Sequence, residues 1–392
     1  MRRAPFITRA VVIGTLLHVY IGLRLLPAGA GWLAYTAPGP WAAAAWAAGG
    51  TLTLLLSCGL IPLAMRNRLP QPQADRLAWA GLLFMGFFSS LFVLTLLRDV
   101  MLLLAWLGAQ AAGRPLPVAV VGISALAVPG LALLASVKGF FNARRRAPVK
   151  TVEVPIAGLP APLHGFTIAQ VSDLHVGPTI KRPYVQAVVD AVNALQADVV
   201  ALTGDIVDGK LAHLAQDAHP LGGLRARHGV YLVTGNHEYY CGVDDWLVQF
   251  RHLGLQLLMN RHVVITHQGA RLVLAGVTDY GAAAFDASQR SDPLGAIAGA
   301  PADVPLRILL AHQPRSAVAA RRAGYTLQLS GHTHGGQFLP WNFFVRLQQP
   351  FTSGLRRLGD MWVYTSRGTG YWGPPMRLGA PSEISLVRLI PG

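Results

Sequence analysis

Hydrophobic positions divide the chain into two parts with different periods. Up to about residue 150, long apolar runs alternate with short polar segments. The runs cover residues 10–26, 41–65, 77–97 and 116–137. Each is close to or above the roughly 20 apolar residues that a transmembrane helix needs, whereas buried helices of soluble proteins are shorter and amphipathic. The pattern predicts a multi-pass transmembrane domain of about four spans over residues 1–137.

From residue 151 the apolar runs shorten to four to six residues, and each run closes on polar residues. They lie at 166–171, 198–202, 230–233, 307–310 and 326–329. Short runs bounded in this way are typical of buried strands. Valines at helical spacing from Val185 to Val192 follow the first strand, and residues 263–266 and 272–277 predict a hairpin. Strand, helix and strand in succession predict an α/β domain with a mostly parallel sheet over residues 151–392.

Charge is distributed as unevenly as hydropathy. Of the formal net charge of +15, residues 1–150 contribute +12 and the remainder +3. The high basic content carries no stripe of cations with interleaved aromatic residues, so we expect no nucleic-acid partner. Residues 138–150, which include Arg144–Arg146, are predicted to be a basic linker facing anionic lipid headgroups.

Basic residues in the loops predict the orientation of the spans. The N-terminus, the segment 66–76 and the linker are rich in arginine or lysine, whereas 27–40 has none and 98–115 is poorer. The third span is expected to continue toward Leu107, with Arg98 and Asp99 near the interface. We expect a cell (inner) membrane protein with both termini and the second domain in the cytoplasm. An alternative is that residues 10–26 and Ala28–Ala30 form a cleaved signal peptide, which leaves three spans and the same location for the second domain.

Metal-ligand side chains follow the predicted strands. They are Asp173, His175, Asp205, Asn236, His312, His332 and His334. Ligands in α/β sheets gather at the carboxyl ends of strands. Oxygen and imidazole donors without thiolates suit Mn, Fe, Zn, Ni or Co, and seven side chains suit two divalent metal ions that share a carboxylate. The two cysteines, Cys58 and Cys241, are too few for a disulfide framework.

The donors stand in five ordered blocks: D-x-H, G-D-x-x-D, G-N-H-E, a later His, and G-H-x-H. This set resembles the calcineurin-like metallophosphoesterase family over residues 150–392. The tail, Tyr364–Gly368 and Trp372–Gly379, is similar to the branch of bacterial membrane-associated phosphoesterases with transmembrane segments ahead of the catalytic domain. The resemblance implies a four-layer α/β/β/α sandwich, whose second sheet the strand pattern alone does not predict.

The resemblance also implies roles for individual residues. Asp173, His175 and His334 would bind one metal, and Asn236, His312 and His332 the other. Asp205 would bridge both, and His237 would be a catalytic residue that faces the substrate phosphate without binding metal. The implied activity is hydrolysis of a phosphodiester or pyrophosphate bond by a metal-activated hydroxide. We expect Asp208 to orient a ligand, and Glu238 to do the same or to cap a helix.

The sequence indicates the substrate less directly than it indicates the metal ligands. Residues 338–345 beside His334 are rich in aromatic side chains, which is typical either of core or of an apolar lip that touches the bilayer. Nearby Arg346, Arg356 and Arg357 would then meet lipid phosphate. The lip favours a lipid-linked substrate, for example a sugar-nucleotide lipid such as the UDP-diacylglucosamine that related enzymes cleave. The alternatives are an anchored phosphodiesterase for soluble nucleotides and a catalytically silent metal-binding scaffold, against which the intact Asp205 and His237 count.

The remaining histidines and three aspartates receive no functional assignment. The histidines are interpreted as surface or loop residues, and the aspartates as helix caps or turn residues. These residues are His164, His213, His219, His228, His252, His262, His267, Asp244, Asp245 and Asp279.

Overall fold

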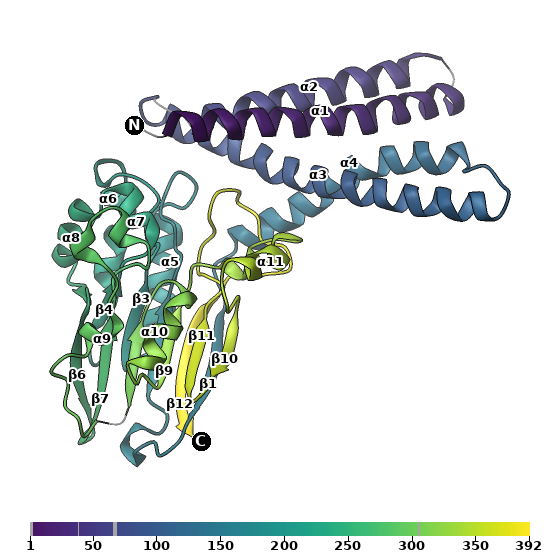
Figure 1. Cartoon of the computed structure of the whole chain (residues 1–392). Helices are drawn as coiled ribbons and strands as arrows, with labels where there is room; N and C mark the ends of the chain where they lie inside the picture. Colours follow the sequence, from purple (N-terminus) through teal and green to yellow (C-terminus); the bar gives the residue numbers. More distant parts are fainter. Residues whose placement is uncertain (1–2, 38, 66–68, 305) are drawn as a thin grey trace. The chain divides into compact units, whose positions relative to one another are not determined.

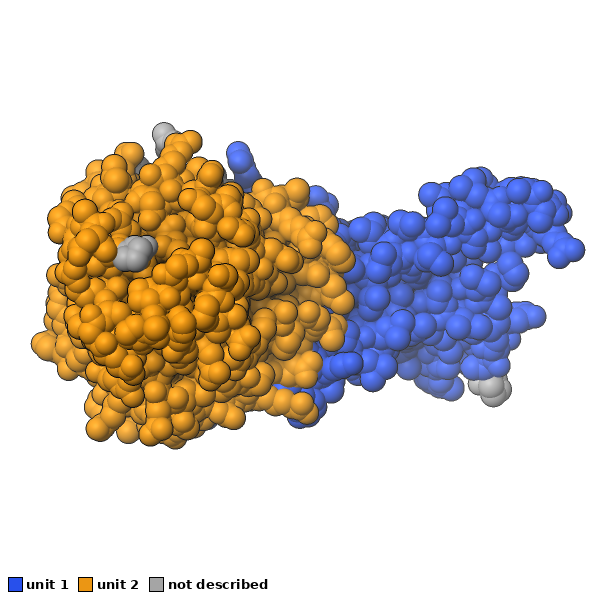
Figure 2. Space-filling view, turned by 90° about the horizontal axis from the view of Figure 1, so that it is seen from below, with its two compact units in different colours: residues 1–141, 373–376 blue, residues 142–372, 377–392 orange. Residues whose placement is uncertain are grey.

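The computed structural model describes residues 3–37, 39–65, 69–304 and 306–392. The chain separates into two compact units (Figures 1 and 2). One comprises Met1–Phe141 with Gly373–Met376, and the other comprises Asn142–Trp372 with Arg377–Gly392. Each unit is described separately below.

Four long helices make up most of the first unit. They are α1 (Arg3–Thr36), α2 (Trp41–Met65), α3 (Gln73–Ala111) and α4 (Val118–Arg144). In the described part of the chain, all four are long and apolar enough to cross a membrane. The expectation of four spans is confirmed at this level, and the protein is a multi-pass membrane protein with four candidate spans.

Helix α3 is longer than the sequence pattern predicted. We expected the third span to continue toward Leu107, and α3 is helical to Ala111, so the connection to α4 is short. Its 39 residues span about 58 Å, roughly twice the hydrocarbon thickness of a bilayer. Arg98 and Asp99 therefore lie within a continuous helix and not at its end.

Those two charges are paired inside the helical unit. Arg24 of α1 donates from Nε to Oδ2 of Asp99 at 2.7 Å and from Nη2 to Oδ1 at 3.0 Å. The hydroxyl of Tyr20 donates to the same carboxylate at 2.7 Å. Arg98 donates to Ser124 of α4 at 2.9 Å. Because charges in apolar surroundings are costly when unpaired, the network both neutralises Asp99 and joins α1, α3 and α4.

Two further expectations concern the basic segments beside the predicted spans. Arg66 and Arg68, which the orientation prediction uses, lie outside the described residues. The basic linker expected over 138–150 is helical through Arg144, and β1 begins at Val149, so an extended connection is limited to the residues between them. Cys58 and Cys241 are both free thiols.

The second unit contains two six-stranded mixed sheets. The first has the order β1-β12-β2-β3-β4-β5, in which β2 to β5 are parallel and β12 is antiparallel to β2. Its strands are β1 (Val149–Ile156), β12 (Ile384–Pro391), β2 (Thr167–Val171), β3 (Val199–Thr203), β4 (Val230–Val233) and β5 (Gln256–Leu257). The three strands predicted here, at 166–171, 198–202 and 230–233, are confirmed within one residue.

The second sheet has the order β10-β11-β9-β8-β7-β6. Its strands are β10 (Gly354–Leu358), β11 (Met361–Thr365), β9 (Leu327–Ser330), β8 (Arg307–Leu310), β7 (Ala270–Gly276) and β6 (Arg261–His267). The predicted hairpin is confirmed as the antiparallel pair β6–β7. Gln268 and Gly269 turn it with φ of 49° and 87°, the left-handed backbone that a two-residue hairpin turn requires.

Helices cover the outer faces of both sheets. Helices α5 (Arg182–Asn193), α6 (Leu211–Ala218) and α8 (Val243–His252) pack on the first sheet, and α9 (Pro293–Ala296) and α10 (Ala317–Arg322) on the second. In β3, Val199 faces the core between the sheets and Val200 faces the helices. Both faces of the strands are buried, which explains their continuous apolar runs. The four-layer α/β/β/α sandwich is confirmed.

Short helical segments complete the second unit. They are α7 (Asn236–Cys241), α11 (Trp341–Phe344) and the single turns η1 (Ala161–Leu163), η2 (His219–Gly223), η3 (Ala282–Ala284), η4 (Ala287–Gln289), η5 (Pro314–Ser316), η6 (His334–Gly336) and η7 (Val345–Leu347).

Candidate dimetal site

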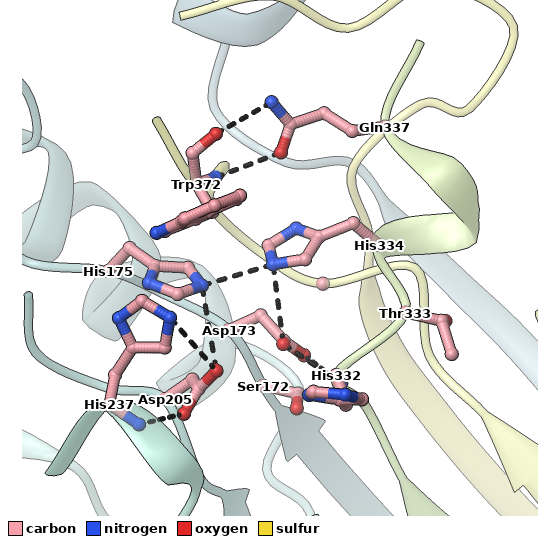
Figure 3. A network of polar contacts seen from close by, with 12 residues as sticks. Ser172, Asp173, His175, Asp205, His237, His332, Thr333, His334, Gln337 and Trp372 are labelled. Carbon is pink, nitrogen blue, oxygen red and sulfur yellow. Dashed lines mark hydrogen bonds and ion pairs between the residues drawn. The ribbon is translucent and has the colours of Figure 1, made fainter. Parts of the chain in front are cut away.

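The predicted ligands lie where the parallel strands of the two sheets end. Asp173 and His175 follow β2, Asp205 follows β3, and Asn236 begins α7 after β4. From the second sheet, His312 follows β8, and His332 and His334 follow β9. Carboxyl ends of parallel strands meet at one edge of a sheet, so these loops converge (Figure 3).

Asp173, His175 and His334 form one compact group. The Nε2 atoms of His175 and His334 are 3.0 Å apart, and Nε2 of His334 is 3.4 Å from Oδ1 of Asp173. All three residues are buried. The structure thus brings together the three residues that the sequence assigned to one metal.

Asp205, His312 and His332 form a second group. Nε2 of His312 is 3.1 Å from Oδ2 of Asp205 and 3.2 Å from Nδ1 of His332. The same Oδ2 lies 4.0 Å from Nε2 of His175 in the first group. Oδ2 of Asp205 therefore belongs to the second group and lies within 4.0 Å of a donor atom of the first.

Asn236 supplies an independent test of whether the residues fit metal ions. Its Oδ1 is buried and has no hydrogen-bond partner in the described part of the chain. Leaving a buried amide oxygen unsatisfied costs about 1–3 kcal/mol. A divalent cation is a partner that such a buried oxygen would accept. The buried His and Asp clusters are consistent with the dimetal site typical of the resembled family.

The backbone at the site is strained. Asp173, His175, Asp205, His332 and His334 all have positive φ, between 51° and 70°. Such conformations cost on the order of 1–3 kcal/mol per residue and persist at functional sites, where the surroundings hold them. Gly331 allows the close packing, since a Cβ there would collide with Ser172 and Asp173.

Burial keeps three of the imidazoles neutral. It lowers the pKa of His175 to about 4 and that of His332 to about 3. Burial, together with the charge of Arg377, lowers the pKa of His334 well below 6.5. Neutral imidazoles keep the lone pair that a metal requires.

His312 and the two aspartates hold the charge of the site. Burial opposes protonation of His312, but the adjacent Asp205 raises its pKa to about 10. Burial would raise the pKa of Asp205, yet His312 and the neighbouring histidines hold it well below 3.8. Burial raises the pKa of Asp173 to about 6. A proton on His312 balances the negative charge of Asp205. A bound cation would displace that proton.

His237 stands beside the shared carboxylate. Its Nε2 is 3.9 Å from Oδ2 of Asp205, and its Nδ1 is 3.0 Å from Oδ1 of Asp208. Burial would lower the pKa of His237, but the hydrogen bond to Asp208 and the charge of Asp205 raise it to about 9. Asp208 was expected to orient a metal ligand; its Oδ2 lies 4.0 Å from Nδ1 of His175, and its hydrogen bond is made to His237.

Glu238 fixes the loop that carries Asp205. Its carboxylate accepts hydrogen bonds from the backbone N–H of Asp205 at 3.0 Å, Ile206 at 2.8 Å and Val207 at 3.2 Å. It also accepts from the N–H of Gly235 at 2.7 Å, which caps α7. Both expected roles, capping and support of the site, are therefore combined in one side chain.

Three residues at the site were not singled out from the sequence. Arg377 is buried and donates to the carbonyl oxygen of His334 at 2.9 Å, with Nη2 3.0 Å from Nδ1 of the same residue. The ring of Trp372 lies 5.8 Å from that of His237, and Gln337 exchanges two hydrogen bonds with the Trp372 backbone (Figure 3). The tail segment Trp372–Gly379 was the available signal, but it indicated only a family branch.

The sequence matches one family model and is similar to two vertebrate membrane proteins. The family model described as calcineurin-like phosphoesterase matches residues 166–336. The chain is 40% identical over 309 residues to a transmembrane protein with metallophosphoesterase domain from Bos taurus, covering 76% of this chain and 69% of that protein. It is 38% identical to the protein of the same description from Danio rerio, covering 65% of this chain and 60% of that one.

The chain is also similar to a bacterial relative and, more distantly, to a solved structure. The chain is 36% identical over 264 residues to an uncharacterized metallophosphoesterase from Helicobacter pylori, covering 65% of this chain and 67% of the relative. The crystal structure of a 5′-nucleotidase precursor from Thermus thermophilus aligns with a TM-score of 0.37 at 16% identity, over 57% of this chain and 54% of that one. Together, the ordered motifs, the two-sheet sandwich and the bovine relative show that the chain belongs to the calcineurin-like metallophosphoesterase family.

Proposed function

We propose that the protein is a membrane-anchored dimetal phosphohydrolase that cleaves a phosphodiester or pyrophosphate bond. The observation that carries the proposal is Oδ2 of Asp205, which lies 3.1 Å from Nε2 of His312 in its own group of candidate ligands and 4.0 Å from Nε2 of His175 in the other. In this proposal, Asp173, His175 and His334 hold one divalent cation and Asn236, His312 and His332 the other. Mn²⁺, Fe²⁺, Zn²⁺ and Ni²⁺ all suit such donors.

When bound, two such cations activate water and offset the charge of the phosphate. The protein supplies the remaining groups. His237 is protonated at neutral pH and directs Nε2 toward the shared carboxylate, where it can donate to a phosphate oxygen or to the leaving oxygen. Asp208 holds the imidazole in that orientation through Nδ1. Trp372 forms an aromatic wall beside His237.

The activity is tested with the full chain in detergent. We expect turnover of bis-p-nitrophenyl phosphate with added Mn²⁺, loss of turnover in a chelator, and recovery when Mn²⁺ is restored. Metal analysis should give at least two equivalents per chain. A correctly folded chain that binds two metals but hydrolyses no phosphodiester or pyrophosphate would favour the catalytically silent scaffold instead.

We further propose that the substrate is carried by a lipid. The segment directly after the His334 loop presents a lip of exposed apolar side chains, namely Leu339, Trp341, Phe343, Phe344 and Leu347. These side chains do not form core, the other interpretation of this segment; within residues 338–344 only Phe338 is a buried apolar residue. Aromatic side chains favour the interfacial region of a bilayer.

Exposed Arg346 and Arg356 are close in sequence to this lip and would suit anionic headgroups. The four candidate spans hold the catalytic unit at a membrane, which raises the local concentration of a lipid-borne substrate. From the distribution of basic residues, we propose the inner membrane with the catalytic unit on its cytoplasmic side. A sugar-nucleotide lipid is one substrate that combines a pyrophosphate bond with acyl chains.

The lip is tested by replacing Phe343 and Phe344 together with Ser. Each exposed aromatic ring that enters a bilayer contributes about 1.5–3 kcal/mol. We therefore expect turnover of a lipid phosphate or lipid pyrophosphate in mixed micelles to fall by at least about ten-fold, and turnover of the soluble diester to stay constant. Leu294→Ser, at an exposed leucine of α9, is the matched control. Hydrolysis of soluble nucleotides with no activity on any lipid phosphate would favour the anchored nucleotide phosphodiesterase.

A further inference from the structure

A second cluster of histidine and aspartate lies at the opposite ends of the strands from the dimetal site. Asp198 directly precedes β3, His228 lies two residues before β4, and His267 ends β6 of the other sheet. One donor atom from each residue lies within 4.8 Å of the other two. We expected both histidines to be surface or loop residues, which is wrong for His267 because it is 6% exposed and ends β6.

The donor atoms face one another at short distances. Nε2 of His228 is 2.9 Å from Nδ1 of His267, and that Nδ1 is 3.7 Å from Oδ1 of Asp198. With bonds of about 2.1 Å at tetrahedral angles, the ligands of a Zn²⁺ ion stand about 3.4 Å apart. The two measured separations lie on either side of that value, so small movements of the side chains would accommodate the ion.

Neighbouring residues already hold two of the three ligands in place. Oδ2 of Asp198 accepts hydrogen bonds from the backbone N–H of Thr167 at 2.9 Å and from its hydroxyl at 3.0 Å, which turns Oδ1 toward His267. The ring of Phe166 contacts both imidazoles, with centroids 5.1 Å from His267 and 6.0 Å from His228. Asp198 and His267 are only 8% and 6% exposed. This preorganisation is what a metal site requires of its surroundings.

The guanidinium group of Arg227 occupies part of the cluster. Nη1 of Arg227 is 3.1 Å from Oδ1 of Asp198, the oxygen that faces His267. The Arg227 side chain is 61% exposed, so it can move into solvent without leaving a buried gap. A metal ion would therefore compete with Arg227 for one carboxylate oxygen.

We propose that Asp198, His228 and His267 form a third metal site, selective for Zn²⁺ or a similar divalent transition metal. Two imidazoles and one carboxylate are ligands that such ions prefer, and three protein ligands leave a fourth position for water. The site joins the amino-terminal edge of the first sheet to the β6–β7 hairpin of the second. It is independent of the proposed hydrolytic activity, because none of its residues belongs to the dimetal site.

The first experiment counts metal. Full-length protein in detergent is stripped of metal, equilibrated with Zn²⁺ alone and analysed for zinc per chain. We expect one equivalent fewer in His228→Gln and in His267→Gln than in the unmodified protein, with Mn²⁺-dependent turnover of the soluble diester unchanged. His213→Gln, at an exposed histidine of α6, is the control and should keep every equivalent. Equal zinc in all four proteins would overturn the proposal.

The second experiment uses a surface variant that does not endanger folding. Arg227→Gln frees Oδ1 of Asp198 and removes a nearby positive charge, so we expect the zinc affinity of the third site to rise several-fold. Calorimetric titration with Zn²⁺ measures it, with the dimetal site already filled. An unchanged or weaker affinity would mean that the cluster is a hydrogen-bonded pair of histidines beside an ordinary ion pair. Absence of hydrolytic activity in the unmodified protein would not affect the zinc count or the zinc affinity, so failure of the proposed function and failure of the third site are distinguishable.

Discussion

The second unit carries a cluster of histidine and aspartate at each end of its strands, and the two clusters are built differently. At the carboxyl ends, five of the proposed ligands have positive φ. At the amino ends, none of Asp198, His228 and His267 is among the residues with positive φ in the described chain. The first cluster gathers donors from five loops around a single carboxylate. The second cluster needs donors from only three segments of the chain. Backbone strain therefore accompanies the number of donors that must converge, and not merely the presence of histidine and aspartate.

The supporting charges differ as well. Behind the first cluster, the carboxylates of Glu238 and Asp208 hold the Asp205 loop and His237. Beside the second, Arg227 places a cation on the carboxylate. These two carboxylates add negative charge beside the first cluster, whereas a metal ion at the second must displace Arg227 from Asp198. We expect the dimetal site to bind metal more tightly than the third site does.

The same substitution at both clusters gives the largest expected contrast. Asp205→Asn removes the charge shared by the two groups of ligands, and we expect turnover of bis-p-nitrophenyl phosphate to fall by at least about 10²–10³-fold. Asp198→Asn should leave that turnover unchanged and remove only the third zinc equivalent. Comparable losses of turnover in both variants would show that the clusters do not act independently.

His237→Ala is expected to have the next largest effect. His237 faces the site without being assigned as a ligand, so turnover should fall by about 10²-fold while two metal equivalents are retained. Asp208→Asn, which weakens the hold on the imidazole, should cost about ten-fold. Steady-state kinetics and metal analysis of the same preparations separate the two properties. If His237→Ala lost metal along with activity, its assignment as a catalytic residue would be wrong.

Glu238→Gln tests the support of the first cluster alone. The amide nitrogen of Gln cannot accept the backbone N–H groups that Glu238 holds, so the Asp205 loop should loosen. We expect the apparent Mn²⁺ affinity, measured from the metal dependence of turnover, to fall by about 10–100-fold. Zinc binding at the third site should not change. Glu153→Gln, at an exposed position of β1, is the control.

The smallest effect concerns the aromatic walls of the two clusters. Phe166 is buried against His228 and His267, whereas Trp372 is exposed beside His237. Aromatic contacts of this kind contribute about 0.5–1.5 kcal/mol, so Trp372→Ala should reduce kcat/KM for the soluble diester by roughly 2–10-fold without changing the melting temperature. Trp372→Phe should restore most of the loss. If Trp372→Phe did not restore kcat/KM, the side chain of Trp372 would not act through its aromatic ring.

The strands and the ligand loops were predictable because burial on both faces leaves a local signature. The continuous apolar runs ahead of Asp173, Asp205 and His312 define β2, β3 and β8, and polar residues mark where each strand ends. The second sheet was not predictable from that pattern, because nothing local says which strands share a sheet. The resemblance to the family supplied the prediction of the second sheet. The continuation of α3 past Arg98 and Asp99 was expected, but the pairing of Asp99 with Arg24 was not, since no local pattern places α1 beside them.

The sequence by itself determined the division into apolar helices and an α/β domain, and the residues that converge on the dimetal site. Those features follow from local hydropathy and from ordered motifs. Only the tertiary structure decided that Asp208 holds His237, that Glu238 binds four backbone amides, and that Asp198, His228 and His267 meet. Each of these depends on side chains from different strands or loops, and side-chain distances across a fold are set by packing that no local pattern records.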